Sequence, residues 1–88
     1  MQQGELVAAE REFSQAVEMA MGGMAFEQKR LEAAKARLAS GLNPQDRKAT
    51  EIEISSAAKA GRIAANKYNR AMSDLQRVRA GLSKLAQP

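Results

Sequence analysis

The sequence predicts an all-α fold, an antiparallel two-helix hairpin that packs like a coiled coil and is completed by self-association or by a partner. Two stretches with a seven-residue apolar repeat, separated by one strong turn signal, support this prediction. We expect a single helical-hairpin domain over residues 1–88, with a helix over about 4–40, a turn over 41–44 and a helix over about 45–86.

The first predicted helix has a seam made of two columns of residues spaced seven apart. Steps of three and four residues hold both columns on one side of a helix. Glu10 and Glu27 interrupt the seam, and fold-back about Asn43 places Glu27 near Lys59 or Arg62, where we expect a salt bridge. The columns are Val17, Met24, Leu31 and Leu38, and Leu6, Phe13, Ala20, Glu27 and Ala34.

Gly22 and Gly23 lie inside this first helix, where each glycine costs about 1 kcal/mol relative to alanine. We expect the helix to continue through the pair, straight or slightly kinked, because fold-back brings small residues beside it. The alternative is a three-helix chain with a hinge at the glycines. The small residues of the second helix at this level are Ala60, Gly61, Ala64 and Ala65.

The turn is predicted by four residues that each suit one position of a helix end or start. Gly41 can adopt the left-handed conformation that ends a helix, and Asn43 can cap the free amides of the next one. Pro44 fits the first helical position, and Asp46 suits the positive end of the helix dipole. So short a connection predicts antiparallel helices.

The second predicted helix carries the more regular seam. Fold-back places Phe13 beside Leu75 and Leu6 beside Leu82, and the seam position of Tyr68 favours a place in the core over a chemical role. The columns are Ile54, Gly61, Tyr68, Leu75 and Leu82, and Ala57, Ala64, Ala71, Val78 and Leu85.

Composition argues against an enzyme. The chain has no Cys and no His, which removes thiolate chemistry, the usual general base and the commonest metal ligand. Its acidic residues are not paired as an acid and base couple, and no phosphate loop, zinc spacing or calcium loop occurs. We therefore expect no catalytic residue, cofactor, metal site or small-molecule substrate.

The sequence also predicts a soluble protein. Its longest uncharged apolar run, Met19–Phe26, is too short to span a bilayer, and the N-terminal region carries Glu5, Glu10 and Glu12 where a signal peptide has basic residues. We expect synthesis in the cytoplasm without a cleaved signal.

Several large apolar residues lie off both seams and predict a protein-binding surface at the waist of the hairpin. With only two Phe, one Tyr and no Trp, an 88-residue chain has little bulky material for a core of its own, so further apolar contact is expected from like subunits or partner helices. Scattered exposed apolar residues are the alternative. The candidate partner-binding residues are Met19, Met21, Phe26, Ile52 and Ile63.

The net charge of +4 is concentrated in the second helix, which predicts a basic face. Such a face could neutralise nucleic-acid phosphates, although no aromatic residues are interleaved for base stacking and a solvated helix face is commoner. Nucleic-acid binding is therefore the alternative function, together with a small chaperone or inhibitor that docks on a partner protein. The candidate residues are Arg62, Arg70, Arg77, Arg79 and Lys84.

Asn43-Pro44 and the segment from Arg70 to Leu75 resemble the turn and the C-terminal helix segment of needle and inner-rod subunits of bacterial type III secretion systems. The resemblance covers most of the chain. It implies a non-enzymatic subunit of a protein secretion apparatus that polymerises helically around a channel, with the C-terminal helix toward the lumen, and that is secreted or assembled at the bacterial surface.

Overall fold

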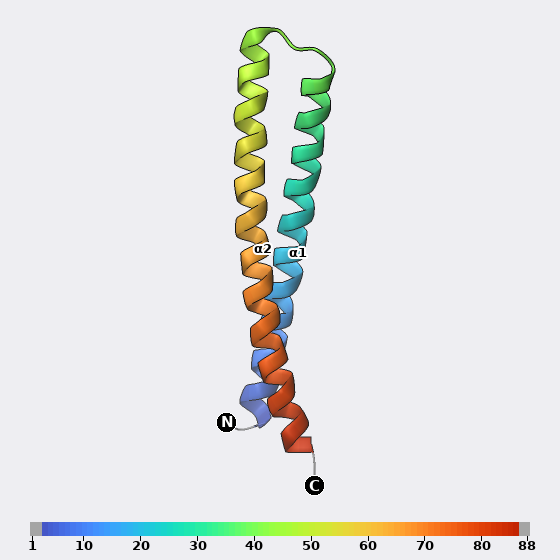
Figure 1. Cartoon of the computed structure of the whole chain (residues 1–88). Coiled ribbons are helices and arrows are strands. Elements are labelled where there is room, and N and C mark those ends of the chain that lie inside the picture. The colour runs from blue at the N-terminus through green and yellow to red at the C-terminus, as the bar shows by residue number, and fades with distance from the viewer. Residues whose placement is uncertain (1–2, 87–88) are drawn as a thin grey trace.

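The computed structural model describes residues 3–86, and within this range the chain is an antiparallel helical hairpin, which confirms the predicted fold class (Figure 1). Helix α1 spans Gln3–Ala39 and helix α2 spans Pro44–Ala86. The hairpin measures 68 × 15 × 14 Å and has a radius of gyration of 19.5 Å, whereas a compact domain of this length has about 12 Å. The molecule is therefore a rod without a second layer.

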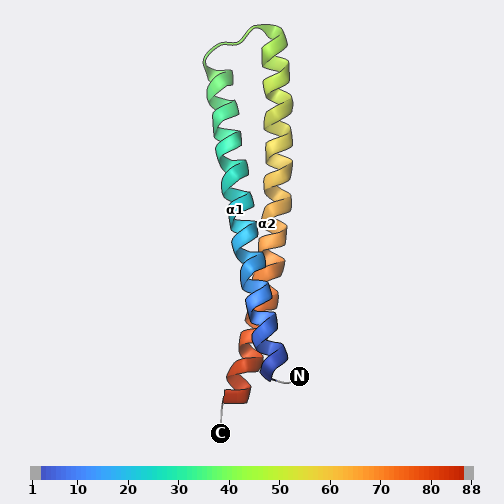
Figure 2. The same ribbon diagram turned by 180° about the vertical axis from the view of Figure 1, so that it is seen from behind.

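The two helices stay side by side along the rod and wind around one another. They cross toward the end that carries both termini, opposite the turn, as the front and rear views agree (Figure 2). A strict seven-residue repeat produces this winding, because it keeps the seam of each helix facing its partner.

The turn forms as the residue types predict, and the helix bounds are within one residue of those expected. Gly41 has φ of +85°, the left-handed conformation that ends α1. The Asn43 side-chain Oδ1 accepts a hydrogen bond of 2.8 Å from the backbone N–H of Asp46, and Asn43 Nδ2 donates one of 2.9 Å to the Asp46 carboxylate. This cap satisfies a free amide at the start of α2.

The predicted seams form the contact between the helices. Every residue of the four columns is buried or half-buried except Leu85, whose exposed fraction is 50%. Placing Leu85 in the seam was wrong, because it lies one turn beyond Gly81, which already packs against Leu6 near the start of α1. At the other end the seam includes Thr50, which is buried and lies seven residues before Ala57.

The core of the described chain is small. Four of its eight buried apolar residues are alanines, and the main cluster is Val17, Ala71 and Leu75. Phe13 packs against this cluster, as the predicted pairing of Phe13 with Leu75 requires, and so does Tyr68. Little apolar area is therefore buried per residue.

Helix α1 continues without a break through Gly22 and Gly23, so the three-helix alternative is wrong. A Cβ added to Gly23 would lie 3.7 Å from the Cβ of Ala64, but one added to Gly22 would have no neighbour within 4 Å. The predicted contact between small residues therefore holds for Gly23 and not for Gly22.

Arginine–glutamate pairs join the helices toward both ends of the rod. Near the turn, Arg37 Nη2 lies 2.8 Å from Glu53 Oε2 and Arg30 Nε lies 3.6 Å from Glu53 Oε1. Toward the termini, Arg79 Nε lies 3.3 Å from Glu10 Oε2. These side chains are partly exposed, so each pair contributes at most about 1 kcal/mol and chiefly favours this register.

The predicted salt bridge from Glu27 to Lys59 or Arg62 is wrong. Glu27 instead pairs within its own helix, where its Oε2 lies 2.9 Å from Arg30 Nη1. The physical reason is proximity, because residues three apart on a helix are immediate neighbours. Across the helices, the Cβ of Glu27 faces Gly61, which has no side chain to offer it.

The hairpin exposes more surface than a compact protein of its mass. Its accessible surface is 6636 Å², whereas a compact monomer of 9.5 kDa has about 5,000 Å². The excess of about 1,600 Å² is comparable to the total area that a standard protein–protein interface buries. Neither described helix has a stretch both long and apolar enough to cross a membrane.

Candidate interaction surface at the middle of the hairpin

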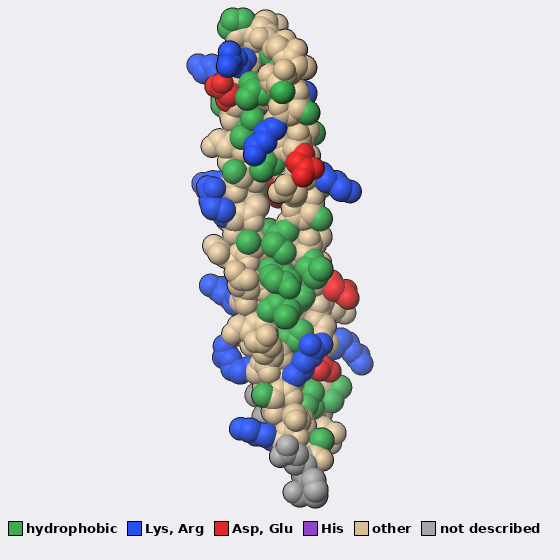
Figure 3. Space-filling model, turned by 45° about the vertical axis from the view of Figure 1, so that its right-hand side comes forward, with side chains coloured by type: hydrophobic (Ala, Val, Ile, Leu, Met, Phe, Trp, Pro, Cys, Tyr) green, Lys and Arg blue, Asp and Glu red, His purple; other side chains and the backbone are tan. Residues whose placement is uncertain are grey.

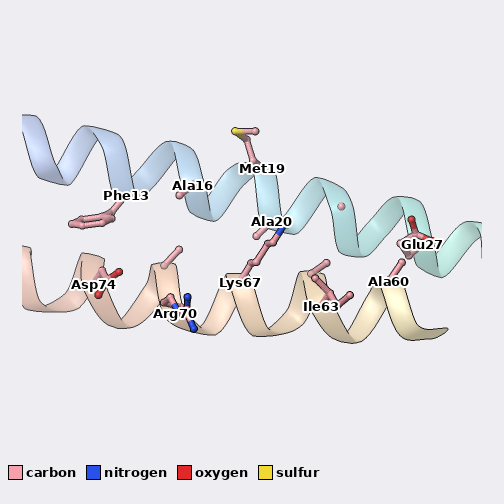
Figure 4. Close-up of a pocket in the computed structure, with 13 residues that line it drawn as sticks. Phe13, Ala16, Met19, Ala20, Glu27, Ala60, Ile63, Lys67, Arg70 and Asp74 are labelled. Atoms are coloured by element: carbon pink, nitrogen blue, oxygen red, sulfur yellow. The ribbon is translucent and has the colours of Figure 1, made fainter. Parts of the chain in front are cut away.

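A groove runs between α1 and α2 at the middle of the rod, with a volume of about 640 Å³ (Figure 4). Its floor consists of small residues from both helices. Without bulky side chains beside the seam, the surface between the helices is hollowed rather than filled. The floor residues are Ala16, Ala20, Gly23, Ala60, Ala64 and Ala71.

Charged and aromatic side chains border this groove. Phe13 lies between the helices at one end, and Lys67 extends from α2 toward Ala20 of α1 (Figure 4). Arg70 and Asp74 follow along α2. The groove is thus apolar along its floor, and the charges of α2 border it toward the termini.

Met19 and Ile63 are the large apolar residues that project beside the floor, one from each helix. Met19 is 79% exposed and points away from α2, and Ile63 is 47% exposed (Figure 4). Phe26, which is 64% exposed, is seven residues from Met19 and therefore lies on the same face of α1. We call Met19, Phe26, Ile63 and the groove floor the waist surface.

Two of the predicted partner-binding residues lie outside the waist surface, although both are exposed. Met21 follows Met19 by two residues, which places it about 200° around the helix. Ile52 precedes Ile63 by eleven residues, or about 16 Å along α2, and does not line the groove. The five predicted residues therefore do not form a single patch.

Apolar side chains gather between the helices at the middle of the rod, with charged side chains around and beyond them (Figure 3). A second depression, of about 350 Å³, lies on the other side of the seam and is lined in part by Met24, Leu31 and Ala58. Its lining residue Gln28 is half a turn around α1 from Met19. The waist surface is the larger of the two and carries the more exposed side chains.

The predicted basic residues do not share one face. Arg79 follows Arg77 by two residues, which places it about 200° around the helix, and it pairs with Glu10. Arg62 lines the second depression, on the other side of the seam. Arg70, Arg77 and Lys84 do form a column with seven-residue spacing, beside the waist surface. Arg77 Nη2 lies 3.4 Å from Asp74 Oδ1, but the Arg77 side chain is 77% exposed, so this column remains accessible.

The groove was not predicted from the sequence. Half of its floor belongs to the seam itself, namely Ala20, Ala64 and Ala71. The other half comes from columns beside the seam, where Ala16 and Gly23 are seven residues apart on α1 and Ala60 has the matching position on α2. The signal that could have located the groove is a set of small residues spaced seven apart beside a seam. Alanine and glycine are too small to fill the space between the two helices there.

Residues 3–86 contain no group of three or more acidic side chains placed to hold a metal ion. Comparison with protein-family models, with curated proteins and with solved structures finds no match to the chain. The resemblance to type III secretion needle and inner-rod subunits therefore stays a prediction, and the waist surface carries the functional argument.

Proposed function

We propose that this protein is a non-enzymatic helical assembly subunit that associates with a second copy of itself through the waist surface. The observation that carries the proposal is the exposure of Met19 and Ile63 at the edge of an apolar groove, with Phe26 exposed one heptad from Met19 on the same face of α1. In a hairpin whose core is half alanine, these are large apolar side chains that the fold leaves in water. Such clusters on small proteins mark interaction surfaces.

The free energy gained by burying these side chains is of the same order as the cost of association. Burying the exposed part of each of the three side chains contributes about 1–2 kcal/mol, or roughly 6–12 kcal/mol for the six side chains of two copies. Lost translational and rotational freedom costs about 4–15 kcal/mol. The two terms are comparable, so the groove floor and the charges beside it determine whether the complex is stable.

Pairwise association fits this surface better than a helical filament. A filament requires two different complementary surfaces on each subunit, whereas a two-fold dimer requires one surface that complements itself. The waist surface occupies one side of the rod. Filaments of the purified protein in electron micrographs would favour the secretion-needle prediction instead.

Light scattering coupled to size exclusion, over a concentration series, tests the proposal. We expect the mass of the wild-type protein to approach twice 9.5 kDa as the concentration rises, and Phe26→Asp to shift it to the monomer. Met21→Asp is the matched control, because Met21 is 52% exposed but faces away from the waist surface. A wild-type monomer at every concentration would refute the proposal.

A further inference from the structure

Two columns of exposed residues run through the waist surface and continue toward the termini, where their side chains carry opposite charges. The α1 column contains Glu5, Glu12, Met19 and Phe26, and the α2 column contains Lys84, Arg77, Arg70 and Ile63. Each column has seven-residue spacing and runs beside a seam that stays in contact along almost the whole rod. Each column therefore stays on one side of its helix. Because Met19, Ile63 and Arg70 line the same groove, the two columns lie on the same side of the hairpin.

Matching members of the two columns lie at nearly the same height. Gly61 is opposite Glu27, and Gly81 is opposite Leu6. Counting from these contacts, Phe26 is one residue from the level of Ile63, and Glu12 is two residues from the level of Arg77. Glu5 is likewise two residues from the level of Lys84, a difference of about 3 Å that these long side chains span.

From this arrangement we infer that the second copy packs on the waist surface with the two-fold axis parallel to the rod. This inference rests on the proposed self-association and adds its geometry. Such an axis lays α1 of each copy over α2 of the other, so that all neighbouring helices are antiparallel, as in a four-helix bundle. Glu12 then faces Arg77 of the second copy, and Phe26 faces its Ile63.

The charges favour this orientation over the reversed one. In the reversed packing the two-fold axis is perpendicular to the rod and lays each helix on the same helix of the second copy. With this axis at the waist surface, midway between Met19 and Phe26, Glu12 would lie against Ala33 and Arg77 against Ser56. Arg30 and Arg37, near Ala33, are already held by Glu27 and Glu53 of their own chain. The reversed packing therefore gives the acidic column no free partner, whereas the parallel axis pairs it with the basic column.

Asp74 is the acidic group that faces the basic column within its own helix. It lines the groove between Arg70 and Arg77 and pairs with Arg77. Because the α2 column carries Arg70, Arg77 and Lys84 against this single carboxylate, the α2 side keeps a net positive charge. It still complements the two glutamates of the α1 column.

The test uses two charge-reversed variants and their mixture. In Glu5→Lys/Glu12→Lys both columns are basic, and in Arg77→Glu/Lys84→Glu both are acidic. We expect each variant alone to dimerise at least tenfold more weakly than the wild type at low salt, and an equimolar mixture to recover the dimer. Glu18→Lys/Glu32→Lys makes the same change in net charge about 100° away on α1 and should dimerise like the wild type.

The outcomes separate the two proposals. The orientation is overturned if the charge-reversed variants remain dimeric, or if mixing them fails to recover the dimer. Self-association still stands in that case, provided that the wild type is a dimer and Phe26→Asp dissociates it. A wild-type protein that stays monomeric overturns both. Circular dichroism on each variant establishes that the helices are intact.

Cross-linking locates the contact directly, because the natural chain has no cysteine. We expect Glu12→Cys mixed with Arg77→Cys to form an interchain disulfide rapidly under mild oxidation. The pair Glu12→Cys and Ala33→Cys should form it slowly, since these positions meet only in the reversed packing. The opposite order of rates would overturn the inference.

Discussion

Replacing Gly22 by alanine should stabilise the protein, because this glycine sits in the interior of α1 without a structural need for it. A Cβ at this position would meet nothing within 4 Å, and the backbone is helical. Alanine is about 1 kcal/mol more favourable than glycine inside a helix. For a domain of this size, that gain raises the melting temperature by about 4–8 °C.

Thermal unfolding followed by circular dichroism at one fixed protein concentration measures this effect, preferably in the Phe26→Asp background, where association does not contribute. Gly41→Ala is the matched control, since φ of +85° at Gly41 makes the same substitution unfavourable by about 1–2 kcal/mol. An unchanged or lower melting temperature for Gly22→Ala would mean that α1 does not run through the glycine pair in solution, and the waist surface would then lose its geometry.

Three further substitutions probe the core, the cap and the polar contacts between helices. Leu75→Ala removes a side chain that is 3% exposed in the central cluster and should cost about 2–4 kcal/mol in the free energy of unfolding, measured by urea denaturation. Asn43→Ala removes the 2.8 Å bond to the Asp46 amide and should cost about 1 kcal/mol, measured the same way; no change would mean that water replaces the cap. Glu53→Gln weakens two partly exposed ion pairs and should lower the free energy of unfolding by less than about 1 kcal/mol. This difference should shrink in 1 M salt. A difference that salt leaves unchanged would contradict the conclusion that these ion pairs are exposed to solvent.

The hairpin could be predicted because local and long-range signals agree in this chain. Gly41, Asn43 and Pro44 each favour the observed turn by their own backbone or side-chain properties. The short turn then sets the register of the two helices, and the seven-residue repeat turns their seams toward each other, which packs Phe13 against the cluster that contains Leu75. Gly22 and Gly23 were ambiguous in the sequence, and packing along the seam carries the helix through them.

Some details could not be predicted because a side chain had candidate partners both within its own helix and across the hairpin. For Glu27 the prediction considered only Lys59 and Arg62 of the other helix, and the observed partner is Arg30, three residues away on α1. Met21 was grouped with Met19 because they are near in the chain, although they face different sides of α1. A groove formed by missing side chains leaves no apolar peak in the sequence, so its floor around Ala16 and Ala60 was overlooked.

The small core and the waist surface have a common physical consequence. Because half of the buried apolar residues of α1 and α2 are alanines, the burial of apolar area only slightly exceeds the entropy cost of ordering 84 residues in an isolated hairpin. A second copy on the waist surface adds apolar burial to the folded state alone, which stabilises it by mass action. The proposed self-association therefore predicts that folding and association are linked and that the dimer is the most stable form of the chain.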